Sequence, residues 1–113
     1  MTVSAVTDQS RFIQIFEDTS ADTGDWYPVG NSPIPAKSLR VQLDVGTGGV
    51  FEIHATDDPT KGVYTTLKIN GTTTFSASDT FTILNQPQWG HIRVKLNSIS
   101  SGTAKAYMTR GDG

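Results

Sequence analysis

The sequence predicts an all-β domain, a single two-sheet sandwich of jelly-roll or immunoglobulin-like type with eight to nine short strands. Several segments alternate apolar and polar residues, which is the period expected of strands that bury one face. Stretches rich in glycine, proline, asparagine and aspartate separate these segments and are typical of turns. No long segment has apolar residues at helical spacing, and only 18% of the 113 residues are charged. These patterns favour a sandwich and leave both topologies open.

The length of the chain suits one domain with one modest core. We expect residues 1–10 to form an N-terminal arm or a lead-in strand and residues 11–113 to form the β-sandwich domain. The first residues lack the basic-then-apolar pattern of a signal peptide, and no apolar run approaches the roughly 20 residues of a membrane span. We therefore expect a complete, short gene product that is made in a cytoplasm and has no membrane partner.

The first predicted strand, Arg11 to Glu17 (RFIQIFE), is apolar on both sides. Alternation places Ile13 and Ile15 on one face and Phe12 and Phe16 on the other. Such a strand is either covered on both faces or presents one apolar face to another chain. A short strand over residues 26–29 follows, where proline marks an edge or an end, and the two prolines of residues 30–37 predict an extended crossing.

Residues 38–55 contain the clearest pair of strands. Apolar residues alternate with polar ones from Leu39 to Val45 and again from Phe51 to Ala55. The glycines of the intervening GTGG stretch supply the positive backbone angles of a tight reversal. We predict a β-hairpin with one apolar and one charged face, which the rest of the chain must cover because two strands cannot bury it alone.

The second half of the chain predicts further strands separated by turns. Asn70-Gly71 is the strongest type I′ turn signal, so residues 72–76 should return antiparallel to a strand over residues 63–69. His91 to Asn97 alternates most regularly, with its apolar residues inward. In the last strand, residues 103–109, the inward residues should be alanines and Met108. Another turn at residues 57–62 and a strand at residues 80–84 complete the prediction.

The sequence predicts no enzyme, no catalytic residue, no cofactor and no metal. His54 and His91 are the two imidazoles, and both occupy outward strand positions without the base-and-nucleophile arrangement of covalent catalysis. The carboxylates near residues 17–25 and at residues 57–58 are interpreted as solvated turn residues rather than calcium ligands or a glycosidase pair. The absence of cysteine removes disulfides and thiolate metal sites. A net charge of −2 argues against nucleic acid as the principal partner.

The outward faces of the strands remain as candidates for partner contacts. If the strands of residues 38–44 and 91–97 are neighbours, their opposite charges can pair across the ladder. Arg40 and Arg93 would then belong to a polar docking surface. Five aromatic residues are further candidates, although core packing is the favoured role for the tryptophans: Trp26, Tyr27, Tyr64, Trp89 and Tyr107. Arg110-Gly111-Asp112 spells the tripeptide read by integrins, which we interpret as a chance match.

Several short sequence segments occur in an order that is seen in known proteins: WYPVG (26–30), SLRVQL (38–43), GGVFEIHATDD (48–58), WGHIRV (89–94) and SGTA (101–104). This order resembles the short all-β structural proteins encoded in the virion gene clusters of tailed bacteriophages. Among these, the chain is most similar in size and plan to capsid decoration (cement) proteins. The resemblance implies a non-enzymatic virion protein that binds the outside of the shell and stabilises contacts between subunits of the major capsid protein. It also implies self-association on the particle.

For this role we expect Phe12, Phe16 and Trp26 to anchor the contact with the shell, and the exposed charges of Arg40 and Arg93 to align it.

The alternative is a phage tail module, or a receptor- or carbohydrate-binding module. In that alternative Trp26 and Trp89, with Asp57 and Asp58, would form a site at the loop end of the sandwich.

Overall fold

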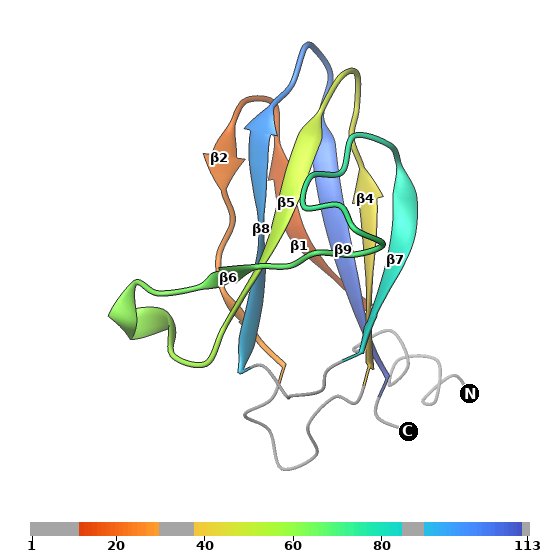
Figure 1. Cartoon of the computed structure of the whole chain (residues 1–113). Coiled ribbons are helices and arrows are strands. Elements are labelled where there is room, and N and C mark those ends of the chain that lie inside the picture. Colours follow the sequence, from red (N-terminus) through yellow and green to blue (C-terminus); the bar gives the residue numbers. More distant parts are fainter. Residues whose placement is uncertain (1–11, 30–37, 85–89, 112–113) are drawn as a thin grey trace, which may run out of the picture.

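In a computed structural model, which describes residues 12–29, 38–84 and 90–111, the chain forms two antiparallel sheets packed face to face (Figure 1). The first, here the β4 sheet, has the order β1 (Phe12–Asp18), β9 (Ala104–Gly111), β4 (Ser38–Asp44), β7 (Asp79–Leu84). The second, the β5 sheet, has the order β2 (Asp22–Thr23), β8 (His91–Ser98), β5 (Val50–Thr56), β6 (Thr65–Thr66), and β3 (Tyr27–Pro28) also pairs with β8. The predicted all-β sandwich is confirmed.

Two predicted segments, the arm of residues 1–10 and the crossing of residues 30–37, lie outside the described residues. A 3-10 helix, η1 (Pro59–Lys61), is the single helical turn in the described ranges. No helix in this part of the chain is long and apolar enough to cross a membrane.

The central hairpin that we predicted over residues 38–55 is wrong. β4 and β5 belong to different sheets, and the glycine-rich stretch between them is an arch that carries the chain across the sandwich. Each strand buries its apolar face against the other sheet, so an arch covers both faces, whereas a hairpin would leave them side by side in one sheet. The backbone N–H of Gly49 donates to the carbonyl of Val45 at 3.0 Å. A Cβ at Gly49 would lie 2.3 Å from that carbonyl oxygen, so only glycine fits.

A second arch, between β8 and β9, lies against the first. The N–H of Thr47 donates to the carbonyl of Ser101 at 3.1 Å, and the N–H of Ser100 donates to the carbonyl of Thr47 at 2.9 Å. These bonds join the two arches at one end of the sandwich. The backbone polar groups of two adjacent crossings therefore satisfy each other without a regular strand.

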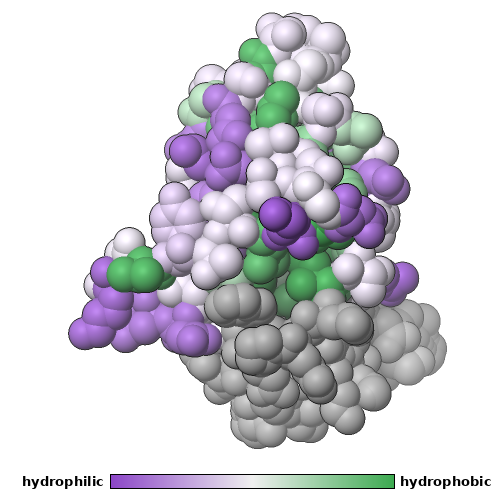
Figure 2. Space-filling view, viewed as in Figure 1, coloured by the Kyte–Doolittle hydropathy of each residue, from purple (hydrophilic) through white to green (hydrophobic). Residues whose placement is uncertain are grey.

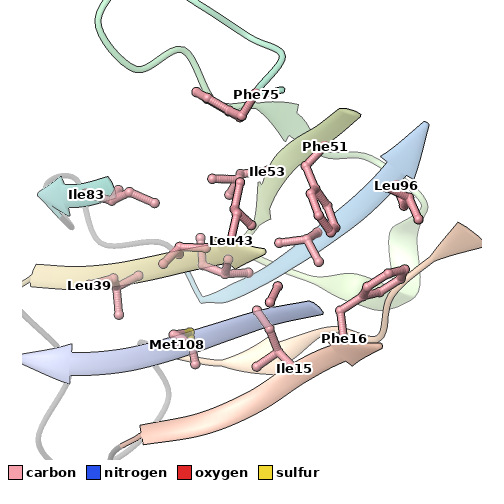
Figure 3. Close-up of a cluster of buried hydrophobic side chains, with 14 of the residues drawn as sticks. Ile15, Phe16, Leu39, Leu43, Phe51, Ile53, Phe75, Ile83, Leu96 and Met108 are labelled. Carbon is pink, nitrogen blue, oxygen red and sulfur yellow. The ribbon is translucent and has the colours of Figure 1, made fainter. Parts of the chain in front are cut away.

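The core lies between the sheets and receives the inward residues of the long strands (Figure 3). Leu39, Val41 and Leu43 of β4 face Phe51 and Ile53 of β5, and all five are at most 2% exposed. The inward positions predicted for the last two long strands are confirmed, because the following residues are also buried: Ile92, Val94, Leu96, Ala104, Ala106 and Met108.

The placement of Phe16 that we predicted, on the face of β1 opposite Ile13 and Ile15, is wrong. Its pairing with β9 shifts register between Gln14 and Phe16, which is a β-bulge. The bulge turns both Ile15 and Phe16 inward, where they are 4% and 7% exposed. Phe16 packs edge-on against Phe51, with ring centroids 5.5 Å apart. Phe16 therefore packs in the core and is not available to a partner.

The segment after β5 follows the edge of that strand in two short stretches. Only Thr65–Thr66 of the predicted strand over residues 63–69 is regular, and the chain returns to β5 where Phe75 and Phe51 exchange backbone hydrogen bonds of 2.9 Å. Between these stretches the predicted Asn70-Gly71 turn is confirmed, with φ of 53° and 80°. The edge of β5 is thus covered by a segment that leaves the sheet and comes back, rather than by a full strand.

Candidate functional site

Side chains from both edges of the β5 sheet converge on its outer face. The register of β5 and β8 places His54 opposite Arg93. Trp26 stands directly before β3, which pairs with β8 at Tyr27 and Ile92. Tyr64 stands directly before β6, which pairs with β5 at Thr65 and Ala55 on the other side. We call the resulting group the Arg93 cluster, and its members are Trp26, Glu52, His54, Tyr64, Arg93 and Asn97.

A chain of hydrogen bonds runs through this cluster. Arg93 Nε donates to His54 Nδ1 at 2.9 Å, and His54 Nε2 lies 3.0 Å from Glu52 Oε1. Asn97 Nδ2 donates to Glu52 Oε2 at 2.9 Å. Because an arginine nitrogen is always a donor, His54 Nδ1 must accept, so the imidazole proton sits on Nε2 and is donated to Glu52. The histidine is therefore a neutral link between a carboxylate and a guanidinium.

Aromatic rings cover this chain. The guanidinium carbon of Arg93 lies 4.3 Å from the ring centroid of Trp26 and 4.7 Å from that of Tyr64. Tyr64 also stacks on His54, with centroids 4.2 Å apart and planes 24° apart. Contacts of a cation with such rings contribute about 0.5 to 2 kcal/mol, depending on how far the cation is desolvated. His54 is left with no exposed surface, although it points away from the sandwich core.

The environment sets the charges of the two titratable members in opposite ways. Burial lowers the pKa of His54, and the nearby positive charge of Arg93 lowers it further, while the hydrogen bond to Glu52 opposes this. Hydrogen bonds from His54 and Asn97 lower the pKa of Glu52. At neutral pH the histidine is neutral and the glutamate is ionised. Our expectation that His54 is a surface strand residue is therefore wrong, because the loop before β6 brings Tyr64 over it.

Next to the cluster, the segment between β5 and β6 forms a projecting lobe, residues 57–64 (Figure 1). Thr56 closes its base by donating from Oγ1 to the carbonyl of Val63 at 2.7 Å. Asp58 caps η1 by accepting hydrogen bonds from Thr60 N at 2.9 Å and from Thr60 Oγ1 at 2.6 Å. These bonds also lower the pKa of Asp58. The turn predicted at residues 57–62 is confirmed, and the Asp58 side chain bonds within the loop itself.

The lobe also carries exposed apolar side chains. Val63 is 71% exposed and Tyr64 is 44% exposed, and they are the exposed large hydrophobic residues of the described ranges. Figure 2 shows apolar and strongly hydrophilic surface side by side on this lobe. A shallow pocket of about 360 Å³ lies between the lobe and the sheet, and its lining residues are Ala55, Thr56, Asp57, Asp58, Lys61, Val63, Tyr64 and Thr65. Tyr64 thus borders both the pocket and the Arg93 cluster.

The structure brings together two of the five residues that we predicted to contact a partner. Trp26 and Arg93 meet in the cluster. Phe16 is a core residue, so its prediction as a surface anchor is wrong. Arg40 is exposed, but it lies on the β4 sheet, whose outer face is on the opposite side of the sandwich from Arg93. The side chain of Phe12 is not among the described ones, and the same holds for Trp89.

Tyr64 was among the five candidate aromatic residues, but three other members of the cluster were not predicted as site residues: Glu52, His54 and Asn97. Their outward positions in the sequence pattern were visible, but the pairing of His54 with Arg93 depends on the register between strands 39 residues apart. A signal existed in the alternation of Glu52 and His54 on one predicted strand and Arg93 on another. Only the register converts that alternation into contacts.

A second groove lies along the open side of the sandwich between β1 and β2. It has a volume of about 400 Å³, and its lining residues are Gln14, Ile15, Phe16, Glu17, Asp22, Thr23, Gly24, Asp25 and Tyr27. Three of these residues are acidic, but no group of three or more side chains within the described ranges is arranged to hold a metal ion. The groove is open to solvent, and its lining is mostly polar.

Comparison with known proteins indicates a fold relationship. No protein-family model matches the sequence, and no curated protein matches it either. Among solved structures, the crystal structure of the SPBc2 prophage-derived protein YomS is similar to this chain, with a TM-score of 0.68 and 13% sequence identity. The match covers 87% of this chain and 89% of that one. The two proteins therefore share a fold over almost their whole length.

Proposed function

We propose that this protein is an accessory structural protein of a bacteriophage particle and that it acts by contact rather than by catalysis. The observation that carries the proposal is the fold likeness to a prophage-derived protein, which spans 87% of this chain. We further propose that its particular role is capsid decoration. In that role it binds the outside of the shell in the virion, associates with further copies of itself there, and stabilises contacts between subunits of the major capsid protein.

The connectivity of the sandwich supports this proposal. Along the chain, six of the eight connections between described strands switch between the β4 sheet and the β5 sheet, and the last described strand returns to lie beside the first. This arrangement favours the jelly-roll alternative over the immunoglobulin-like one, because an immunoglobulin-like sandwich joins several consecutive strands within one sheet. Double-sheet jelly rolls are common in viral capsid and lectin domains.

The Arg93 cluster and the lobe are the surface that we assign to the shell contact. Tyrosine, tryptophan and arginine are the residue types that contribute most to protein interfaces when they are held in place, and Trp26, Tyr64 and Arg93 touch one another here. The exposed side chains of Val63 and Tyr64 continue this surface onto the lobe. Many weak copies of one contact on a shell give strong overall attachment.

The test is co-sedimentation of the purified protein with capsids that lack it, over a series of salt concentrations. We expect saturable binding at a fixed ratio to shell subunits. Tyr64→Ala should weaken binding at least tenfold, whereas Arg40→Gln on the opposite face should leave it unchanged. Weakening of both variants to the same extent would remove the Arg93 cluster from the contact. An absence of binding at every salt concentration would contradict the decoration role.

A second candidate function is a phage tail module that binds a receptor carbohydrate, and the pocket beside Tyr64 favours it. An aromatic face at the rim of the pocket and the carboxylates of Asp57 and Asp58 in its lining are the groups that hold a sugar ring and its hydroxyls. Binding to an array of bacterial surface glycans tests this candidate. A specific signal that Tyr64→Ala abolishes would support it over capsid decoration.

A further inference from the structure

We propose that Arg93 is a carboxylate-binding residue and that its ligand is an aspartate or glutamate side chain of the protein partner, flanked by apolar residues. The inference rests on the proposed function for the existence of a protein partner. It adds the residue that makes the central polar contact and the chemistry that this residue recognises.

The guanidinium of Arg93 is already held in position. Its Nε is fixed by the bond of 2.9 Å to His54 Nδ1, and its flat surface contacts the rings of Trp26 and Tyr64. Of its five N–H donors, this uses one. Among the residues that the structure describes, none accepts a hydrogen bond from the two terminal nitrogens of Arg93. Those nitrogens are the fork that binds a carboxylate with two parallel hydrogen bonds, and a fork that is held beforehand loses less entropy on binding.

Glu52, the acidic residue of the cluster, does not neutralise Arg93 by direct contact. Glu52 directs one carboxylate oxygen at His54 and the other at Asn97. A neutral imidazole therefore separates the two opposite charges along the hydrogen-bonded chain. The arrangement orients the arginine while its positive charge remains available to an incoming anion.

The surroundings select a single carboxylate on an apolar segment rather than a polyanion. The chain has a net charge of −2, and the lobe carries Asp57 and Asp58 against a single lysine, Lys61, which disfavours a run of phosphates. Val63 and Tyr64 offer exposed apolar surface beside the cluster. An acidic residue between apolar neighbours matches the guanidinium of Arg93 beside two exposed apolar side chains.

The test is an NMR titration of the full-length, ¹⁵N-labelled protein with a capped Leu-Glu-Leu tripeptide and with its Leu-Gln-Leu counterpart. We expect the Nε–H signal of Arg93 and the indole signal of Trp26 to shift and saturate with the glutamate peptide. The glutamine peptide should bind at least tenfold more weakly. Arg93→Lys, which keeps the charge but loses the fork, should weaken binding of the glutamate peptide by about tenfold, and Arg40→Lys should not change it.

Several outcomes would overturn the inference. Equal binding of the two peptides would remove the carboxylate from the contact, and an equal effect of Arg40→Lys would remove Arg93. Tighter binding of inorganic phosphate or of glucuronate than of the glutamate peptide would assign the site to a different ligand class. If Arg93→Lys does not fold, the two peptides still give the comparison in the unaltered protein. The titration contains no capsids, so its failure is distinguishable from a failure of co-sedimentation.

Discussion

On the outer face of the β5 sheet, side chains of two strands and two loops join in one cluster, whereas the described residues around Arg40 on the outer face of the β4 sheet are not joined in this way. There, Arg40, Gln42, Thr80 and Thr109 surround a shallow pocket of about 220 Å³. Their side chains make no hydrogen bond to one another within the described ranges. Both faces come from strands with the same alternation of apolar and polar residues.

The difference lies in what stands opposite each arginine and in what covers it. Arg40 is paired with Thr82 on one side and with Thr109 on the other. Neither threonine has an aromatic ring or, within the described residues, passes a hydrogen bond from the arginine on to a carboxylate, as His54 does. Arg93 is paired with His54, which passes the hydrogen bond on to Glu52. Two polar faces that each carry an arginine on a central strand can therefore differ in order, because the cross-strand partners and the covering loops differ.

The largest expected effect comes from removing the link in the middle of the cluster. His54→Ala leaves Arg93 Nε and a carboxylate oxygen of Glu52 without their partner and opens a gap under Tyr64, which should lower the free energy of unfolding by about 2 to 3 kcal/mol. Gln42→Ala on the opposite face should cost less than about 0.5 kcal/mol. Urea unfolding of both variants measures this, and equal costs would contradict the contrast between the faces.

The next effect concerns the two arginines directly. Arg93→Ala removes one hydrogen bond and two ring contacts, and we expect a loss of about 1 to 2 kcal/mol in the free energy of unfolding. Arg40→Ala should change it by less than about 0.5 kcal/mol because the side chain is exposed. The same urea experiment compares the two, with circular dichroism as the control that both variants keep the fold. A larger loss for Arg40→Ala would reverse the comparison.

A smaller effect is expected from the lobe. Tyr64→Ala removes the ring that covers His54 and Arg93, and because Tyr64 is 44% exposed we expect a cost of about 1 kcal/mol. Tyr64→Phe keeps the ring and should cost less than about 0.5 kcal/mol. Thermal unfolding of the two variants separates the contribution of the ring from that of the hydroxyl. An equal drop in Tm for both would show that the hydroxyl, rather than the stacking, stabilises the cluster.

The pH dependence of stability should also come from the β5 face. The pKa of His54 is lower in the folded chain than the ordinary histidine value of 6.5, so the unfolded chain binds more protons between the two values. The contribution of His54 to the free energy of unfolding should therefore be fully present above pH 6.5 and decrease as the pH falls toward the pKa of His54 in the folded chain. Glu52 adds a further loss of stability below its ordinary pKa of 4.5, because its pKa is also lower in the folded chain than in the unfolded chain.

Urea unfolding between about pH 3 and pH 8 checks this, with His54→Gln as the control. Glutamine can accept from Arg93 and donate to Glu52 but does not titrate, so the step below pH 6.5 should disappear while the step below pH 4.5 remains. An unchanged profile in His54→Gln would assign the upper step to another group.

Several parts of the fold could be predicted from the sequence because they depend on neighbours along the chain. The alternation of His91 to Asn97 determines which side chains are buried, since any sandwich must cover the apolar side of that strand. The turn at Asn70-Gly71 follows from the ability of these two residues to adopt positive φ.

What the tertiary structure decided are the relations between distant segments. The sequence could not show that β4 and β5 face each other across the core rather than pair in a hairpin, because both arrangements use the same glycine-rich link and the same apolar residues. Nor could it show the bulge that turns Phe16 inward, since a bulge depends on the register with β9. The burial of His54 depends on β8 supplying Arg93 and on the lobe supplying Tyr64. Alternation assigns a residue to a face, but only the packing of other segments on that face decides whether it is exposed or enclosed.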